Sequence, residues 1–171
     1  MNPTYIDRDI VNRLISNRVP AAVVVAGPFE TARLVARLRT AGYTGSIFGG
    51  PSMGRRRFFE TAGAAGENVL FPLTGNELCE SFSARFQKRY GRTSDYASAH
   101  TYDAVRLITD AVRRGGLNRA RIRDALVELS PWSGRSGMVR WDPLGQNDRA
   151  AGLGTIKEGR VVPGLPSDTQ R

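Results

Sequence analysis

The side chains of this chain that could do chemistry are few, and their spacing does not bring them together as a catalytic set. Ser52 is a candidate nucleophile, but a serine needs a neighbouring base. The single histidine, His100, falls inside a predicted helix over residues 96–114 and is interpreted as a packing residue. The glycine-rich segment 49–54 lacks the lysine and the spacing of a phosphate-binding loop. We therefore predict no catalytic residues and a protein that is not an enzyme.

Metal and cofactor sites are not expected either. Cys79 is the only cysteine and His100 the only histidine, so the chain offers neither a disulfide framework nor a paired set of zinc ligands. Asp103 and Asp142 are not placed as a carboxylate pair by their spacing. Asp103 is expected to face a polar cleft or to cap a neighbouring helix. We predict that the chain holds neither a cofactor nor a metal ion.

The elements that would position a binding site lie between residues 20 and 73. Residues 21–26 form a short apolar, β-branched run, and an amphipathic helix is predicted over 31–41. Residues 46–48 and 68–71 give two further strands. This is the pattern of a parallel α/β unit. In open parallel sheets ligands bind outside the carboxyl ends of the strands, so function is expected at loops 27–30 and 49–53.

Downstream of residue 76 the pattern becomes helical. Helices are predicted over 77–90, 96–114 and 119–129, followed by a strand at 138–141, a hairpin of 153–157 with 160–162, and a disordered tail over 163–171. The apolar residues of the middle helix are expected to be buried: Tyr102, Val105, Leu107, Ile108 and Val112. Three successive helices need a sheet to cover, and this chain supplies none nearby.

Composition narrows the possible partners. The chain has 171 residues, a net charge of +9, and 23 arginines among its 25 basic residues. These arginines are scattered along polar helix faces, and the cluster at 55–57 is interpreted as a solvated first helical turn, so no nucleic-acid partner is expected. No apolar run approaches the roughly 20 residues that span a bilayer. The first residues lack a secretory signal, which suggests a cytoplasmic protein or a missing natural beginning.

The order of the sequence signals resembles the type I periplasmic binding proteins, in particular the branch that binds branched-chain amino acids for ABC transporters. No single piece is diagnostic, but order and spacing together are specific, and the resemblance covers roughly residues 7–163. The matching segments are Ala21 to Gly27, Leu38 to Tyr43, Ile47 to Gly50, Ala62 to Val69, Phe82 to Gly91, Ala99 to Val105, Ile122 to Leu126, and Gly134 to Gly137 leading to Trp141 and Asp142.

This resemblance implies a partial type I fold with two α/β lobes that trap a ligand between them. Residues 1–73 and 137–163 would belong to the second lobe, 74–136 would cover the sheet of the first lobe, and 164–171 would be a tail. The chain then corresponds to the carboxyl-terminal half of such a protein. The implied function is substrate binding, without chemistry, for an ABC-type importer of amino acids or related small organic solutes.

The resemblance also implies where ligand binds and which partners to expect. Carried over by position, the ligand-contacting residues are Pro28, Phe29, Pro51 and Ser52. Relatives usually have an acidic residue where this chain has Pro51, so the ligand need not be an amino acid. Glu30 could replace that carboxylate or could simply stabilise the first turn of its helix. The other implied partners are an ABC permease and either a missing amino-terminal lobe or a second copy of the chain.

Two other functional classes remain open at this stage. The same bilobed fold serves in ligand-sensing domains of regulators and receptors, and a small α/β enzyme is the less favoured reading. Family resemblance predicts a periplasmic or otherwise extracytoplasmic location. Neighbouring permease and ATPase genes would favour transport, whereas a fused output domain would favour sensing. An upstream signal peptide with an amino-terminal lobe would settle truncation and compartment.

Overall fold

The computed structural model describes residues 3–73, 80–149 and 151–164, which group into two compact units. The first, called here the sheet unit, contains the described residues up to 73 together with 152–164. The second, the helical unit, contains the described residues from 80 to 151. No described helix combines the length and the apolar character needed to cross a membrane.

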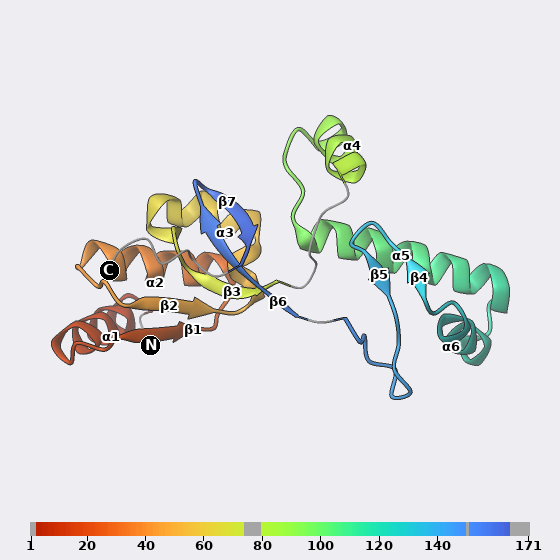
Figure 1. Ribbon diagram of the computed structural model, residues 1–171, viewed down its shortest axis with the longest axis horizontal. Coiled ribbons are helices and arrows are strands. Elements are labelled where there is room, and N and C mark those ends of the chain that lie inside the picture. The colour runs from red at the N-terminus through yellow and green to blue at the C-terminus, as the bar shows by residue number, and fades with distance from the viewer. Residues whose placement is uncertain (1–2, 74–79, 150, 165–171) are drawn as a thin grey trace. The chain divides into compact units, whose positions relative to one another are not determined.

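The sheet unit is built on five strands in the order β1-β2-β3-β6-β7 (Figure 1). The strands are β1 (Ala21–Val24), β2 (Ser46–Gly49), β3 (Leu70–Leu73), β6 (Gly152–Lys157) and β7 (Arg160–Pro163). β1, β2 and β3 are parallel, whereas β6 runs antiparallel to β3 and β7 antiparallel to β6. The predictions of adjacent parallel strands at 23–25 and 47–48 and of a terminal hairpin are confirmed.

One face of this sheet is covered by helices. They are α1 (Pro3–Ser16), α2 (Pro28–Thr40) and α3 (Arg56–Ala62), with short 3-10 turns η1 (Pro51–Gly54) and η2 (Gly63–Gly66). Val11 of α1 and Val35 of α2 belong to the same buried cluster as Val24 of β1 and Phe58 of α3. All three helices therefore pack on this one face, called here the covered face.

The opposite face of the sheet is bare at its β1 end. Alternate residues of β1 are exposed and buried, with Ala22 and Val24 inward and Val23 75% exposed. Phe48, which is in register with Val23, is 38% exposed, and Val25 at the end of the strand is 79% exposed. Further across the same face, Leu70 and Thr155 are buried. Val23, Val25 and Phe48 are together called here the bare patch.

The helical unit contains α4 (Glu80–Tyr90), α5 (Tyr96–Gly115), α6 (Arg119–Glu128) and a short ribbon of β4 (Trp132–Ser133) and β5 (Met138–Val139). Asp95 begins α5 by accepting a hydrogen bond of 3.0 Å from the backbone N–H of Ser98, and the Ser98 hydroxyl accepts in return from the backbone N–H of Asp95. Asn118 caps α6 in the same manner through the backbone N–H groups of Ala120 and Arg121. Predicted helix residues 77–79 lie outside the described residues.

The prediction that the apolar residues of α5 are buried is wrong for most of them. Leu107 is buried, but Val105 is 61% and Ile108 52% exposed, and Tyr102 is exposed as well. The physical reason is that one face of α5 contacts α6 and the ribbon of β4 and β5, and the ring of Tyr102 packs against Phe82 of α4. Val105 and Ile108 remain exposed in the part of the chain that the structure describes.

Asp103 also differs from expectation, because it neither faces a cleft nor caps a helix. Its side chain is 4% exposed and accepts hydrogen bonds from the backbone N–H groups of Arg135 at 2.7 Å and Ser136 at 2.6 Å. The Ser136 hydroxyl donates a third at 2.7 Å. The carboxylate thus attaches the loop between β4 and β5 to α5.

The prediction places residues 137–151 with the sheet-bearing segment. In the structure β5 pairs with β4, and the described residues of this stretch group with the helices. Only residues from 152 onward return to the sheet. Assignment of the two units to the two lobes of a receptor remains a prediction. The predicted disordered tail begins too early, because Pro163 belongs to β7 and the backbone N–H of Gly164 donates to the carbonyl oxygen of Leu153. The rest of that tail, 165–171, lies outside the described residues.

Candidate functional site

The structure brings the two predicted ligand loops together at the carboxyl edge of the parallel strands. The first loop follows β1 and leads into α2, and the second follows β2 and leads into η1. The Ser52 hydroxyl donates a hydrogen bond of 2.9 Å to the carbonyl oxygen of Ala26, although the two residues are 26 positions apart. Ser52 is therefore a tether between the loops, and its oxygen keeps lone pairs that can accept a further hydrogen bond.

Backbone N–H groups are concentrated where the first loop meets α2. Gly27 is the N-cap in an extended conformation and gives no side-chain cap, and Pro28 is the first helical residue. Because the first N–H groups of an α-helix have no intrahelical partner, Phe29 and Glu30 present donors at this edge. The positive end of the helix dipole adds to them, so the loop favours a polar or negatively charged ligand atom.

Phe29 is flanked by two arginines. The guanidinium carbon of Arg57, on α3, lies 5.5 Å from the centre of its ring, and that of Arg33, one turn along α2, lies 5.7 Å away. Both distances are within the range of cation–π attraction. The ring is 39% exposed, so it remains available as an apolar surface between two positive charges.

Glu30 supplies the one carboxylate of the first loop. A Cβ atom at position 27 would lie 2.5 Å from Glu30 Oε2, which shows that the side chain folds back over Gly27. The carboxylate makes no hydrogen bond or ion pair with the described residues and does not cap its own helix. It is exposed, and its position leaves it able to meet a positively charged group.

The second loop is supported from beneath by Met53, which is fully buried. A Cβ atom at Gly49 would lie 2.3 Å from Met53 Cε and 2.9 Å from the carbonyl oxygen of Val24, so only glycine fits between this side chain and β1. Pro51 opens η1 and is exposed. Of the four predicted ligand-contacting residues, Phe29 and Pro51 are exposed and offer apolar surface. Pro28 begins α2 and Ser52 joins the two loops, so these two residues act on the conformation of the loops.

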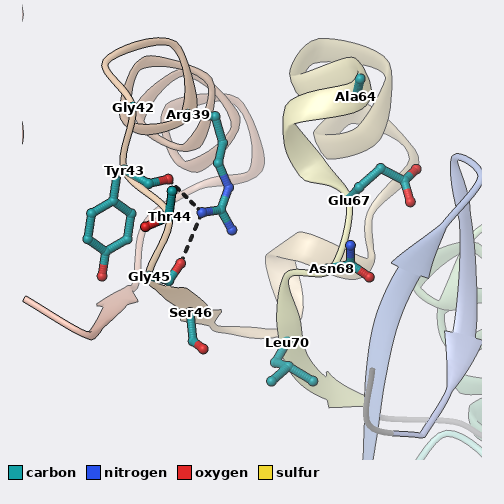
Figure 2. A pocket seen from close by; sticks show the side chains of 10 residues that line it. All are labelled: Arg39, Gly42, Tyr43, Thr44, Gly45, Ser46, Ala64, Glu67, Asn68 and Leu70. Atoms are coloured by element: carbon teal, nitrogen blue, oxygen red, sulfur yellow. Dashed lines mark hydrogen bonds between the residues drawn. The ribbon is translucent and has the colours of Figure 1, made fainter. Parts of the chain in front are cut away.

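A cavity of about 610 Å³ lies at the other edge of the sheet, at the amino ends of β2 and β3 (Figure 2). Its charged residues already have structural partners. Arg39 donates hydrogen bonds to the carbonyl oxygens of Tyr43 at 2.8 Å and Gly45 at 3.0 Å, as Figure 2 shows. Glu67 accepts from the backbone N–H groups of Glu158 and Gly159 and so holds the turn between β6 and β7. We therefore place the candidate site at the carboxyl edge.

Sequence reasoning missed Arg33 and Arg57 as members of the site. The available signal was the separation of four between Phe29 and Arg33, which puts them on one helix face. Arg57 carried no local signal, because it reaches Phe29 only through the packing of α3 beside α2. Among the described residues there is no group of three or more histidine, cysteine, aspartate or glutamate side chains that could hold a metal ion.

Several solved structures have this fold. The chain superposes on the leucine-binding protein LivK of Thermotoga maritima with a TM-score of 0.79 and 23% identity, covering 94% of this chain and 49% of that one. For LivJ of Streptococcus pneumoniae, solved with isoleucine, the TM-score is 0.78 and the identity 21%, and the match covers 92% of this chain and 48% of that one. For an ABC-transporter solute-binding protein of R. palustris, solved with benzoate, the TM-score is 0.77 and the identity 16%, and the match covers 91% of this chain and 45% of that one.

The chain therefore spans about half the length of the solved proteins that it resembles. No curated protein shows significant sequence similarity to it. A family model described as periplasmic binding protein matches residues 8–160. Since that match includes both candidate loops and most of the chain, the chain belongs to the periplasmic binding protein family, and it has a partial form of the type I fold.

Proposed function

We propose that the chain supplies one wall of the ligand cleft in the substrate-binding component of an ABC-type importer. Its ligand is an amino acid or a related small organic solute, which the protein binds without chemical change. The other wall comes from a second lobe, and the assembled receptor works with an ABC permease outside the cytoplasm. The observation that carries this proposal is the pair of tethered loops, with Phe29 exposed between them and open N–H groups beside it.

Three features support a binding role. The loops leave neighbouring parallel strands at their carboxyl ends, where ligands of open α/β sheets bind. The family match covers both loops, and the relatives are solute-binding proteins. The Ser52 hydroxyl donates to a backbone carbonyl rather than to a base, which argues against a nucleophile at this position.

The proposal is tested in a chimera in which residues 1–171 follow the amino-terminal half of the T. maritima leucine-binding protein. Folding is verified by a cooperative thermal melt, and binding is measured by calorimetry with leucine, isoleucine and benzoate. We expect micromolar or tighter binding of at least one of these ligands. A cooperatively folded chimera that binds none of them, and whose melting temperature none of them raises, contradicts the proposal.

Phe29→Ala is expected to weaken binding in the chimera by about 1–3 kcal/mol, the range for a buried aromatic contact. The same change should leave the melting temperature of the unliganded protein nearly unaltered, because the ring is partly exposed and lies outside the buried cluster. Calorimetry with the tightest ligand measures the effect. Phe59→Ala, which removes a neighbouring ring of α3, is the control, and equal affinities for Phe29→Ala and the parent would remove the first loop from the site.

Glu30 is expected to replace the carboxylate that relatives have at the position of Pro51. In the chimera, Glu30→Gln should weaken binding of leucine or isoleucine at least tenfold, about 1.4 kcal/mol, since the ligand ammonium loses its counter-charge. Binding of benzoate, which has no ammonium, should stay the same or improve. A loss of similar size for both ligand types would show that Glu30 acts on the first turn of α2 instead.

A further inference from the structure

One surface of the helical unit combines concentrated positive charge with an exposed apolar side chain. It lies where α5 ends and α6 begins, two helices that pack against each other and are joined by residues 116–118 (Figure 1). Residues 113–123 contain five arginines and no acidic residue, so they contribute +5 to a chain whose net charge is +9. More than half of the net positive charge therefore lies in this short stretch, called here the arginine tip.

The arginines of the tip are all exposed. Arg113 lies 3.6 Å from Asp110, but 77% of its side chain is accessible, and Arg123 pairs with its neighbour Asp124 at the surface. The other three make no hydrogen bond or ion pair with any described residue: Arg114, Arg119 and Arg121. Most of the positive charge of the tip is thus available to a partner outside the chain.

Helix stability does not account for the arginines at the start of α6. The amino end of a helix carries a partial positive charge, so acidic side chains stabilise it and basic ones do not. Arg119 is the first residue of α6 and Arg121 the third, and the first turn contains no acidic residue. Arg113 and Arg114, by contrast, lie in the last turn of α5, where positive charge is favourable. An anionic partner would offset the unfavourable charge at the start of α6.

Leu117 lies between these arginines and is 95% exposed. Two local contacts commonly cover an apolar residue at such a position. Gly116 ends α5 with a φ of 66°, and the residue after such a glycine often contacts the last turn of the helix. The residue before an N-cap often packs on the fourth residue of the new helix, which here is Ile122. The exposure of Leu117 shows that neither contact buries it, so the tip presents an apolar side chain to solvent.

This combination fits the surface of an anionic phospholipid bilayer. Clusters of basic residues are attracted to anionic headgroups, and the attraction grows with each arginine near the surface. An apolar side chain among them can enter the boundary between headgroups and acyl chains. Nucleic acid also attracts arginine through its phosphates, but phosphate contacts are made by basic and polar side chains and give Leu117 no apolar environment. A lipid surface accommodates both the charge and the leucine.

We propose that the arginine tip is a membrane-association site, in which the arginines bind the phosphates of anionic phospholipids and Leu117 enters the interface beneath them. The tip belongs to the helical unit, whereas both candidate ligand loops belong to the sheet unit. The proposal therefore goes beyond the proposed function and does not depend on which solute binds.

Co-sedimentation of the 171-residue chain with phospholipid vesicles tests this proposal. The vesicles are phosphatidylcholine alone or with about 30% phosphatidylglycerol, in about 50 mM or about 500 mM sodium chloride. The tip variant combines three substitutions: Arg114→Gln, Arg119→Gln and Arg121→Gln. The control variant removes the same charge from exposed sites of the sheet unit: Arg13→Gln, Arg18→Gln and Arg160→Gln. Because all six side chains are exposed, both variants should keep the circular dichroism spectrum and melting temperature of the parent.

We expect the parent to bind the anionic vesicles at least about tenfold more tightly than the neutral ones at low salt, and to lose most of this binding at high salt. The tip variant should bind the anionic vesicles at least about tenfold more weakly than the control variant, since its three charges act together at one place. Leu117→Ser should weaken binding about threefold or more while all arginines are present. Equal binding by the tip and control variants would overturn the proposal, because net charge alone would then cause adsorption.

A fluorescent label distinguishes a lipid surface from other anionic partners. An environment-sensitive dye is attached to Leu117→Cys or, as a control on α3, to Thr61→Cys, each in a chain that carries Cys79→Ser. We expect anionic vesicles to shift the emission of the dye at position 117 to shorter wavelength and to leave the dye at position 61 unchanged. A short DNA duplex at equal phosphate concentration should bind more weakly than the vesicles. Tighter binding of the duplex, lost in the tip variant, would overturn the lipid proposal in favour of nucleic acid.

Discussion

Asp103→Ala is expected to lower the free energy of unfolding of the helical unit by about 3–5 kcal/mol, the scale for removing the buried charged partner of several donors. The carboxylate is almost completely buried and accepts three hydrogen bonds of 2.6–2.7 Å from Arg135 and Ser136. Alanine leaves these donors without an acceptor and opens a gap beneath the loop. Because the loop joins β4 to β5, the ribbon should separate from α5.

Tryptophan fluorescence during urea unfolding measures this effect selectively. The chain has two tryptophans, Trp132 and Trp141, and both lie in the helical unit. The matched control is Asp124→Ala on α6, whose exposed carboxylate pairs with Arg123 at the surface and should cost less than 1 kcal/mol. Similar midpoints for the two variants would show that the Asp103 contacts contribute little.

Phe58→Ala is expected to destabilise the sheet unit by about 3–5 kcal/mol, as large-to-small changes of buried aromatic residues do. Phe58 is fully buried on α3, and a Cβ atom at Gly66 would lie 3.2 Å from its ring, so the surroundings fit it closely. The cavity would lie between α3 and η2. Since α3 begins directly after the second ligand loop, binding in the chimera should weaken as well.

Tryptophan fluorescence does not report directly on the sheet unit, because both tryptophans lie in the helical unit. Far-ultraviolet circular dichroism in urea therefore measures this change. Phe48→Ala in the 171-residue chain is the control, since it removes the same side chain from the exposed patch and should cost less than 1 kcal/mol. A shift of the tryptophan transition equal to the shift in circular dichroism would mean that the two units unfold together. Equal stability of the two variants would contradict the described core.

Local patterns were sufficient to predict most elements of the sheet unit. The apolar run at 21–26, the helical period over 31–41 and the glycine at position 42, which adopts a φ of 87° after α2, each depend on neighbours in the sequence. The location of the two candidate loops could be predicted as well, because the loops that follow neighbouring parallel strands lie at the same edge of the sheet. The hydrogen bond from the Ser52 hydroxyl to the carbonyl oxygen of Ala26 was not predictable, since it depends on how closely the two loops approach each other.

The predictions for Asp103, Val105 and Ile108 were wrong for a different reason, because the burial of a side chain depends on residues that are distant in the sequence. Asp103 meets a loop more than 30 positions away, and its own helix pattern gives no sign of that partner. The structure explains the glycine at position 134, because a Cβ atom there would lie 2.3 Å from Asp103 Oδ2. Val105 and Ile108 do lie on an apolar stripe of the helix, as their spacing predicts. Whether that stripe is buried depends on another element covering it, and both residues are exposed.

The connection between β3 and β6 has a consequence for synthesis of the protein. The chain leaves the sheet after Leu73 and returns at Gly152, which pairs directly with it, so the whole helical unit is inserted between two neighbouring strands. Ribosomes add about 5–20 residues per second. For several seconds the nascent β3 therefore has an open edge, because the residues of the helical unit are added to the chain before β6 can pair with it. Translation speed across residues 75–151 should then influence the yield of correctly paired protein.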